Sequence, residues 1–349
     1  MSNSPRKITV LVVDDSAVVR GMWVRHLAKD PIIEIVGTSS NGDAAVKDVQ
    51  KHSPDIVLLD IEMPVMDGLQ ALDQIIKIKP NTRVIMASTL TTNGSRATVA
   101  ALTKGAVDFV TKPSSTGGKD LEAVAQELIE KIRLLGPAHL SAEPIVSQIK
   151  STSKNRSGIK PRAIVVASST GGPNALSTFL SGLPTNLQQP IFIVQHMPPV
   201  FTALLAERLS REGTRSCVEV TASTVVKSGL VYLAPGGAHL KLAANNSLIT
   251  LEIDRASPEE NFCRPAADVL FRTAAAVFGA DIIAVVLTGM GEDGKRGCEI
   301  IKATGGVILA QDQSTSVVWG MPGAVVGADL ADEIVKIQDM AAMVAKHCL

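Results

Sequence analysis

Several polar residues in the N-terminal third of the chain follow short apolar runs, and such places are where parallel strands end and functional groups gather. Asp14 and Asp15 follow the first run, and Asp60 closes the third. Three carboxylates at one sheet edge repel one another unless a divalent cation lies among them, and Mg²⁺ suits such oxygen ligands. Lys112 and Ser88, which follow two further runs, could then hold a phosphoryl group. Solvent-facing acids are the alternative, but the combination outweighs it.

A second set of polar residues lies in the C-terminal half. Ser169 follows an apolar run and precedes the glycine-rich segment 170–173, where a helix start would offer free N–H groups to an oxyanion. Later runs end in His196, a candidate general base, and in a loop with Glu292 and Asp293. Alone, the serine more often caps a helix or binds phosphate, the histidine is more often structural, and the acidic loop could bind a cation. Together they indicate a nucleophile, a base and an orienting acid.

Two α/β halves would position these residues. In the first half we expect strands at Ile8–Val13, Ile32–Thr38, Ile56–Asp60, Val84–Ser88 and Val107–Thr111. Helical patterns lie between them, as at Ala17–Ala28 and Leu69–Ile78, and an apolar stripe from Leu121 to Leu135 predicts a final helix. Strands that alternate with helices predict a parallel, doubly wound sheet.

The same alternation returns after a segment typical of a linker, residues 136–161, which is rich in Ser, Lys, Asn and Pro. Expected strands are Ala163–Ser168, Ile191–Gln195, Val218–Ala222, Leu230–Ala234, Asp281–Leu287 and Val307–Ala310, with a β-hairpin around Asn245-Asn246. Expected helices are Val200–Glu212, Ala266–Phe278, Gly297–Ala303 and Gln338–His347. The sequence thus predicts an α/β protein of two doubly wound, mostly parallel-sheet domains, residues 1–135 and 162–349.

Composition excludes several classes of protein. The 349 residues are 46% hydrophobic and 19% charged, with 34 basic and 34 acidic side chains, so no basic excess attracts nucleic acid or an anionic membrane. The apolar runs are far shorter than the about 20 residues that span a bilayer. Four cysteines without a close pair suit a reducing compartment. We therefore expect a cytoplasmic protein that neither binds nucleic acid nor inserts into a membrane.

The first half resembles the receiver domains of response regulators. The resemblance rests on the segments 13–16, 60–68 and 112–113 and covers roughly residues 7–133. It implies that Asp60 is phosphorylated in a Mg²⁺-dependent reaction. The Mg²⁺ ligands that it implies are Asp14, Asp15, Asp60 and the backbone carbonyl of Glu62, and the phosphoryl-binding and switch residues are Ser88, Phe109 and Lys112.

The second half resembles the chemotaxis-type protein-glutamate methylesterases. The segments Ser-Thr-Gly-Gly (169–172), Gln-His-Met-Pro (195–198) and Gly-Met-Gly-Glu-Asp-Gly (289–294) carry the resemblance, which spans roughly residues 162–349. It implies hydrolysis of glutamyl methyl esters on chemoreceptors, deamidation of receptor glutamines, and a catalytic domain without a cofactor. The site residues that it implies are Ser169 as nucleophile, His196 as base, Asp293 as its partner, and Thr170 and the backbone N–H of Met290 at the oxyanion.

The order of the two halves matches the family's arrangement, which implies an esterase that the receiver inhibits until a chemotaxis histidine kinase phosphorylates it. One alternative is a signalling module whose second half binds a partner and catalyses nothing, but the presence of all three triad residues argues against it. Another is a DNA-binding response regulator. The α/β pattern of the second half, without a basic recognition helix, argues against that one.

Overall fold

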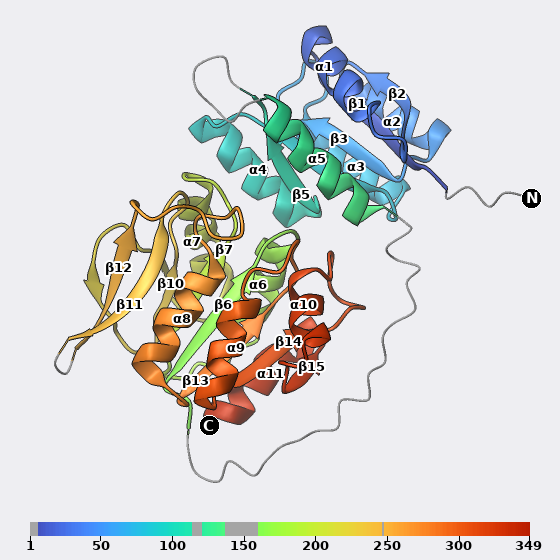
Figure 1. Ribbon diagram of the computed structural model, residues 1–349. Helices are drawn as coiled ribbons and strands as arrows, with labels where there is room; N and C mark the ends of the chain where they lie inside the picture. Colours follow the sequence, from blue (N-terminus) through green and yellow to red (C-terminus); the bar gives the residue numbers. More distant parts are fainter. Residues whose placement is uncertain (1–5, 114–120, 137–159, 246–247) are drawn as a thin grey trace, which may run out of the picture. The chain divides into compact units, whose positions relative to one another are not determined.

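The structure, a computed structural model, describes residues 6–113, 121–136, 160–245 and 248–349. The chain divides into two compact units, Met1–Glu143 and Pro144–Leu349, each with its own central sheet (Figure 1). The predicted linker, residues 136–161, lies outside the described residues except at its ends. No helix in the described ranges is both long and apolar enough to cross a bilayer.

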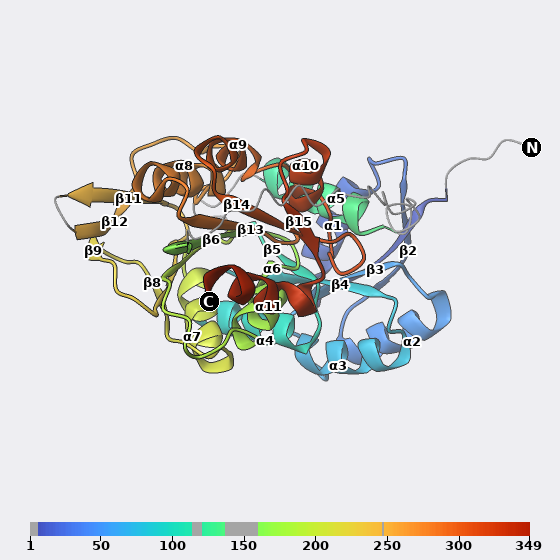
Figure 2. The ribbon, with the colours of Figure 1, turned by 90° about the horizontal axis from the view of Figure 1, so that it is seen from below.

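The N-terminal unit contains a five-stranded parallel sheet in the order β2-β1-β3-β4-β5. The strands are β1 (Ile8–Val13), β2 (Ile33–Ser39), β3 (Ile56–Asp60), β4 (Arg83–Ser88) and β5 (Asp108–Thr111). The helices are α1 (Ala17–Leu27), α2 (Gly42–His52), α3 (Gly68–Ile78), α4 (Thr92–Lys104) and α5 (Leu121–Leu135). Helices α1 and α5 cover one face of the sheet, and α2, α3 and α4 cover the other (Figure 2).

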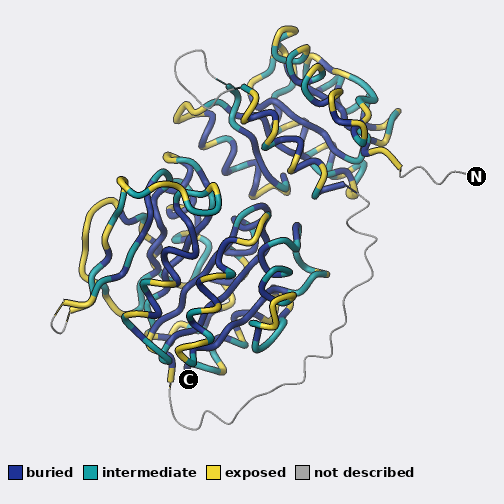
Figure 3. Tube along the Cα trace, in the orientation of Figure 1, coloured by how far each residue is buried: buried dark blue, intermediate teal, exposed yellow. Residues whose placement is uncertain are grey.

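Burial on both faces explains why the strands of this sheet are continuous apolar runs. All five residues of β3 are buried, and the inner strands appear dark blue in Figure 3. Polar side chains then end strands or begin helices: Ser16 caps α1, and Asp67 forms a capping box with Gln70 at α3. Because β1 lies beside β3, Asp14 and Asp60 reach the same sheet edge.

The C-terminal unit contains a seven-stranded parallel sheet in the order β15-β14-β13-β6-β7-β10-β8 and a three-stranded antiparallel sheet, β11-β12-β9. The strands are β6 (Ala163–Ser168), β7 (Ile191–Gln195), β8 (Cys217–Glu219), β9 (Thr224–Val225), β10 (Val231–Leu233), β11 (His239–Asn245), β12 (Leu248–Asp254), β13 (Ile282–Val286), β14 (Val307–Gln311) and β15 (Glu333–Val335). The two doubly wound sheets and the hairpin β11–β12 confirm the predicted fold class. Strands β9 and β15, of two and three residues, were not predicted.

Within the described part of the C-terminal unit, six helices flank the seven-stranded sheet. They are α6 (Gly172–Ser181), α7 (Phe201–Glu212), α8 (Ala267–Phe278), α9 (Lys295–Thr304), α10 (Met321–Gly327) and α11 (Ile337–Cys348). Helices α6, α7 and α11 lie on one face, and α8, α9 and α10 lie on the other (Figure 2). Strand β6 is flanked by β7 on one side and by β13 on the other, so the strand order reverses there. Such a switch point brings the segments that follow neighbouring strands together at one edge.

Candidate functional sites

Two adjacent serines end β6, and their surroundings differ. Ser168 is fully buried, and its hydroxyl donates to Oε1 of Gln195 over 2.7 Å. Ser169 is half-buried, and its hydroxyl has no hydrogen-bond partner among the described residues. Its backbone is fixed, because its N–H donates to Thr288 O and its carbonyl accepts from Gln195 Nε2. The backbone of Ser169 is therefore fixed while its hydroxyl is available, whereas the hydroxyl of Ser168 is engaged with Gln195.

The segment after Ser169 is a tight glycine turn that starts α6. Gly171 has a φ of 77°, which favours glycine, and a Cβ at Gly172 would lie 2.0 Å from Oε1 of Gln195. A Cβ at Gly289 would lie 2.8 Å from Cβ of Ser169, so the loop after β13 passes directly beside the serine. Within the described ranges, the N–H of the next residue, Met290, makes no hydrogen bond. Gly172 and Gly289 thus allow close packing around Ser169, and the N–H of Met290 is an unused donor near it.

The histidine that follows β7 is joined directly to the acidic loop after β13. Nε2 of His196 lies 2.8 Å from Oδ2 of Asp293, and both side chains are largely buried. A carboxylate only accepts, so Nε2 carries a hydrogen, and in the neutral form of the ring Nδ1 then has the lone pair that can take a proton. Register places Gln195 opposite Ser168 on the neighbouring strand, and the N–H of His196 donates to the carbonyl of Ser168 over 3.1 Å, so the backbone of His196 lies beside the serine turn. Among the described residues, no hydrogen bond joins the Ser169 hydroxyl to the imidazole.

Asp293 accepts an unusual number of hydrogen bonds. The backbone N–H groups of Ala267 and Asp268, in the first turn of α8, donate to it over 2.6 and 3.1 Å, and that of Gly294 over 3.0 Å. Nδ2 of Asn261 donates to its Oδ1 over 2.9 Å. Burial raises the pKa of Asp293, but His196 and these backbone donors outweigh burial and lower it. The carboxyl group is therefore held ionised beside the imidazole.

Cys263 occupies the other side of the imidazole ring. Its Sγ lies 3.6 Å from Nδ1 of His196. Burial lowers the pKa of His196, but the hydrogen bonds to Asp293 and Cys263 oppose burial, and the pKa is raised above its usual value. No motif in the sequence marks Cys263 or Asn261 as a residue of this site. Both lie in a turn far from the triad in the chain, so only the fold brings them to the site.

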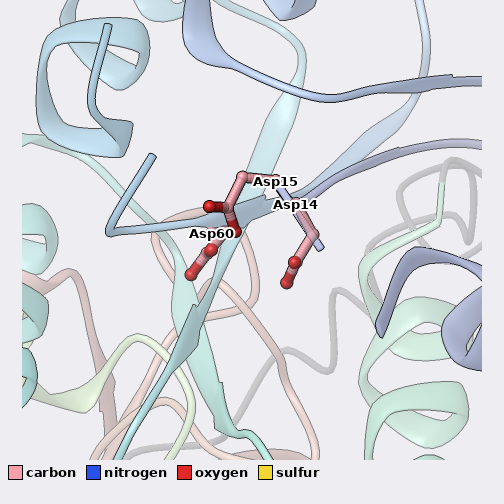
Figure 4. A group of neighbouring side chains, drawn as sticks. All are labelled: Asp14, Asp15 and Asp60. Carbon is pink, nitrogen blue, oxygen red and sulfur yellow. The ribbon is translucent and has the colours of Figure 1, made fainter. Parts of the chain in front are cut away.

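Three aspartates of the N-terminal unit, Asp14, Asp15 and Asp60, also lie together (Figure 4). One carboxylate oxygen from each of Asp14, Asp15 and Asp60 lies within 4.8 Å of the others. Asp14 and Asp60 are buried and Asp15 is exposed, and Asp15, Asp60 and Glu62 line a cavity of about 340 Å³. Burial raises the pKa of Asp60, and the charge of Asp14 adds to that effect. Hard oxygen donors whose charges are incompletely offset fit Mg²⁺.

Lys112 is the main counter-charge of this cluster. Its Nζ lies 2.7 Å from Oδ2 of Asp14 and 2.7 Å from Oδ1 of Asp60. Burial lowers the pKa of Lys112, but its two carboxylate partners outweigh burial and raise it. The lysine is thus charged and placed where it can also reach a group attached to Asp60.

The two remaining candidates of this unit lie deeper. The Ser88 hydroxyl accepts from Thr98 Oγ1 over 2.6 Å and contacts the carbonyl of Gly94, so it is engaged with α4, while Thr89 lines the cavity. Phe109 is only 6% exposed, with the ammonium of Lys131 5.5 Å from its ring centre. The ring is therefore already turned inward.

Two family models match the chain. The model for the CheB methylesterase matches residues 164–344, and the model for the response regulator receiver domain matches residues 10–123. A protein-glutamate methylesterase/protein-glutamine glutaminase of Caulobacter vibrioides is 44% identical over 97% of this chain and 98% of its own length. A protein-glutamate methylesterase/protein-glutamine glutaminase of Trichodesmium erythraeum is 40% identical over 96% of this chain and 97% of its own length. The crystal structure of the CheB methylesterase catalytic domain of Thermotoga maritima covers 54% of this chain with a TM-score of 0.52 and 39% identity, and 99% of that domain is covered.

Proposed function

The chain belongs to the CheB methylesterase family, with a receiver domain ahead of the methylesterase domain, and we propose that it hydrolyses glutamyl methyl esters of chemoreceptors through Ser169, His196 and Asp293. The single observation that carries this proposal is the His196–Asp293 hydrogen bond of 2.8 Å at the sheet edge where Ser169 lies, with the N–H of His196 donating to the carbonyl of Ser168. A base with an ionised partner, and a neighbouring serine hydroxyl without a hydrogen-bond partner among the described residues, are what nucleophilic ester hydrolysis requires.

The first half of the reaction forms an acyl-enzyme. Ser169 Oγ attacks the ester carbonyl carbon while its proton passes to Nδ1 of His196, and Asp293 stabilises the imidazolium through Nε2–H. The negative oxygen of the tetrahedral intermediate is held by the backbone N–H of Met290, with Thr170 beside it. Collapse breaks the ester C–O bond. The leaving methoxide takes the proton from His196 and departs as methanol.

The second half regenerates the enzyme. Water loses one proton to Nδ1 of His196 and attacks the acyl carbon, the bond from that carbon to Ser169 Oγ breaks, and the proton returns from His196 to Ser169. The glutamic acid side chain that is released then ionises by losing its proton to the solvent. A receptor glutamine follows the same route, with ammonia leaving in place of methanol. No step of this sequence needs a cofactor in the catalytic domain.

The receiver supplies the switch. Asp60 accepts the phosphoryl group from a chemotaxis histidine kinase, and Mg²⁺ held by Asp14, Asp15, Asp60 and the Glu62 carbonyl would offset the negative charge that gathers there. Lys112 reaches the same place and would pair with a phosphoryl oxygen. Ser88 would do so after releasing its bonds to α4. Because Phe109 is already buried, its inward position alone cannot be the signal.

Phosphorylation relieves an inhibition of the esterase by the receiver in this proposal. The protein acts in the cytoplasm, where the methylated receptor segments and the kinase would be accessible. The single chain keeps the receiver at a high effective concentration beside its target.

Release of methanol from methylated receptor membranes tests the proposal. The full chain should release methanol faster with Mg²⁺ and a small phosphodonor than without, while Asp60→Asn should stay at the slow rate and take up no phosphoryl label. A full chain that releases no methanol under either condition would refute the esterase. Equal rates with and without phosphodonor, at full labelling, would refute the control by phosphorylation.

A further inference from the structure

A two-residue turn ahead of α8 contacts both members of the His196–Asp293 pair. Glu260 and Cys263 exchange two backbone hydrogen bonds of 3.1 and 3.0 Å, and the two residues between them, Asn261 and Phe262, have φ values of 54° and 61°. Positive φ values at both central positions define the type of turn that joins tight hairpins. The turn is also fixed to α8, because Arg272 makes two hydrogen bonds of 3.0 Å to the Glu260 carboxylate.

The two central side chains point to different surroundings. Phe262 is 98% exposed. Asn261 is half-buried, and its Nδ2 donates to Oδ1 of Asp293 over 2.9 Å and to Oδ2 of Asp268 over 2.8 Å. An amide nitrogen has two hydrogens, so both are used, one on each carboxylate. Asn261 therefore bridges two acidic groups that would otherwise face each other without a side-chain donor between them.

The bridge acts on the oxygen of Asp293 that does not contact the imidazole. Oδ2 faces His196, and Oδ1 receives Asn261. The backbone N–H groups of Asp268 and Gly294 donate to the same oxygen, and Asn261 is the side-chain donor among these bonds, which together restrict rotation of the carboxylate and keep Oδ2 aligned with Nε2–H. Burial raises the pKa of Asp268, and the charge of Asp293 adds to that effect, so the two carboxyl groups do interact.

We propose that Asn261 is a positioning residue of this esterase: its amide holds the Asp293 carboxylate in the orientation that supports His196 and screens it from Asp268. The inference rests on the proposed function. Asn261 acts only through Asp293 and need not contact the substrate. Its contribution should therefore be found in kcat, where the imidazolium forms, and not in KM.

Glycine and aspartate both accept a positive φ, so substitutions at this position can remove the amide without opposing the turn. A purely turn-forming role predicts that Asn261→Gly keeps its kcat. A positioning role predicts a fall of about tenfold or more, since a hydrogen bond to a charged group is at stake. Asn261→Asp should fall further, because a third carboxylate cannot donate and repels the other two. Phe262→Gly is the matched control, since it removes an exposed side chain from the adjacent position with a similar φ.

The test measures kcat and KM for methanol release by the full, phosphodonor-treated chain. We expect kcat to fall in the order Phe262→Gly, Asn261→Gly, Asn261→Asp, with Phe262→Gly equal to the wild type and KM within about twofold throughout. In an Asp293→Asn background, Asn261→Gly should cost little more, because the two residues act as one unit. Equal kcat of Asn261→Gly and Phe262→Gly, or full additivity with Asp293→Asn, would overturn the inference. If one of these results is found while Ser169→Ala is inactive, the positioning role of Asn261 is refuted and the proposed esterase function is not.

Discussion

Asp293 caps helix α8, which contains Asp268, and Asp268 in turn caps helix α9, which begins just after Asp293. Asp293, just ahead of α9, accepts from the first two N–H groups of α8, and Asp268, in the first turn of α8, accepts from Gly297 N in the first turn of α9 over 2.7 Å. Neither helix has a capping side chain at its own N-cap residue. The carboxylate proposed to support His196 is thus part of the scaffold that joins two helices, and both carboxyl groups lie at positive helix ends.

This reciprocal capping of α8 and α9 predicts that the Asp268→Ala protein is less stable than the wild type. The substitution leaves the start of α9 without its acceptor, which costs about 1–2 kcal/mol of the free energy of unfolding. The control is Asp339→Ala, because Asp339 is also in the first turn of a helix but is exposed and has no side-chain hydrogen bond among the described residues. Urea denaturation compares the two. Equal stabilities would show that the capping of α9 by Asp268 is unimportant.

The pH dependence of the esterase should reflect the raised pKa of His196. Only the neutral imidazole accepts the serine proton, so kcat/KM should rise with pH, with its midpoint above the usual histidine value of about 6.5. Cys263→Ala removes one of the groups that raise this pKa, so the midpoint should move to lower pH. A Cys263→Ala profile that superimposes on the wild type, or one displaced to higher pH, would contradict the assigned contact.

Cys263 should also be the thiol through which the esterase is inactivated. Cys217, Cys298 and Cys348 are buried, and burial raises the pKa of each thiol, whereas Cys263 is only partly buried. Iodoacetamide should therefore label one cysteine of the folded chain, and the added group beside Nδ1 of His196 should abolish methanol release. Cys263→Ala should keep its activity after the same treatment. A singly labelled, fully active enzyme would disprove this.

Mg²⁺ should compensate for the loss of the Lys112 charge that stabilises the buried carboxylates of Asp14 and Asp60. Lys112→Met leaves Asp14 and Asp60 buried without their shared partner, so the N-terminal unit should be less stable, and Mg²⁺ should raise its Tm more than that of the wild type. Lys104→Met is the control, because Lys104 pairs with Asp73 at the surface. Its response to Mg²⁺ should match that of the wild type. A Lys112→Met protein that ignores Mg²⁺ would contradict metal binding at this cluster.

The strands that position both sites were predictable from the sequence because both of their faces are buried. β1, β3, β6 and β7 begin and end where their apolar runs do. Strands β9 and β15 were not predicted, and β9 has only two residues and is held by pairing with β12. Strand ends alone predicted that a carboxylate of the loop with Glu292 and Asp293 would lie near His196, and only the family resemblance pointed to Asp293. The roles of Asn261 and Cys263 could not be predicted, because their contacts depend on how the turn ahead of α8 folds back across the sheet edge.

The two serines that end β6 allow the most direct test of the proposed triad. Ser169→Ala removes the available hydroxyl, and Ser168→Ala removes the buried one that binds Gln195. With a phosphodonor, we predict that Ser169→Ala releases no measurable methanol from methylated receptor membranes and keeps the wild-type Tm. Ser168→Ala should retain turnover and lose about 1–3 kcal/mol of stability, since it leaves a buried acceptor unpaired. Methanol release by Ser169→Ala at the wild-type rate would contradict the account.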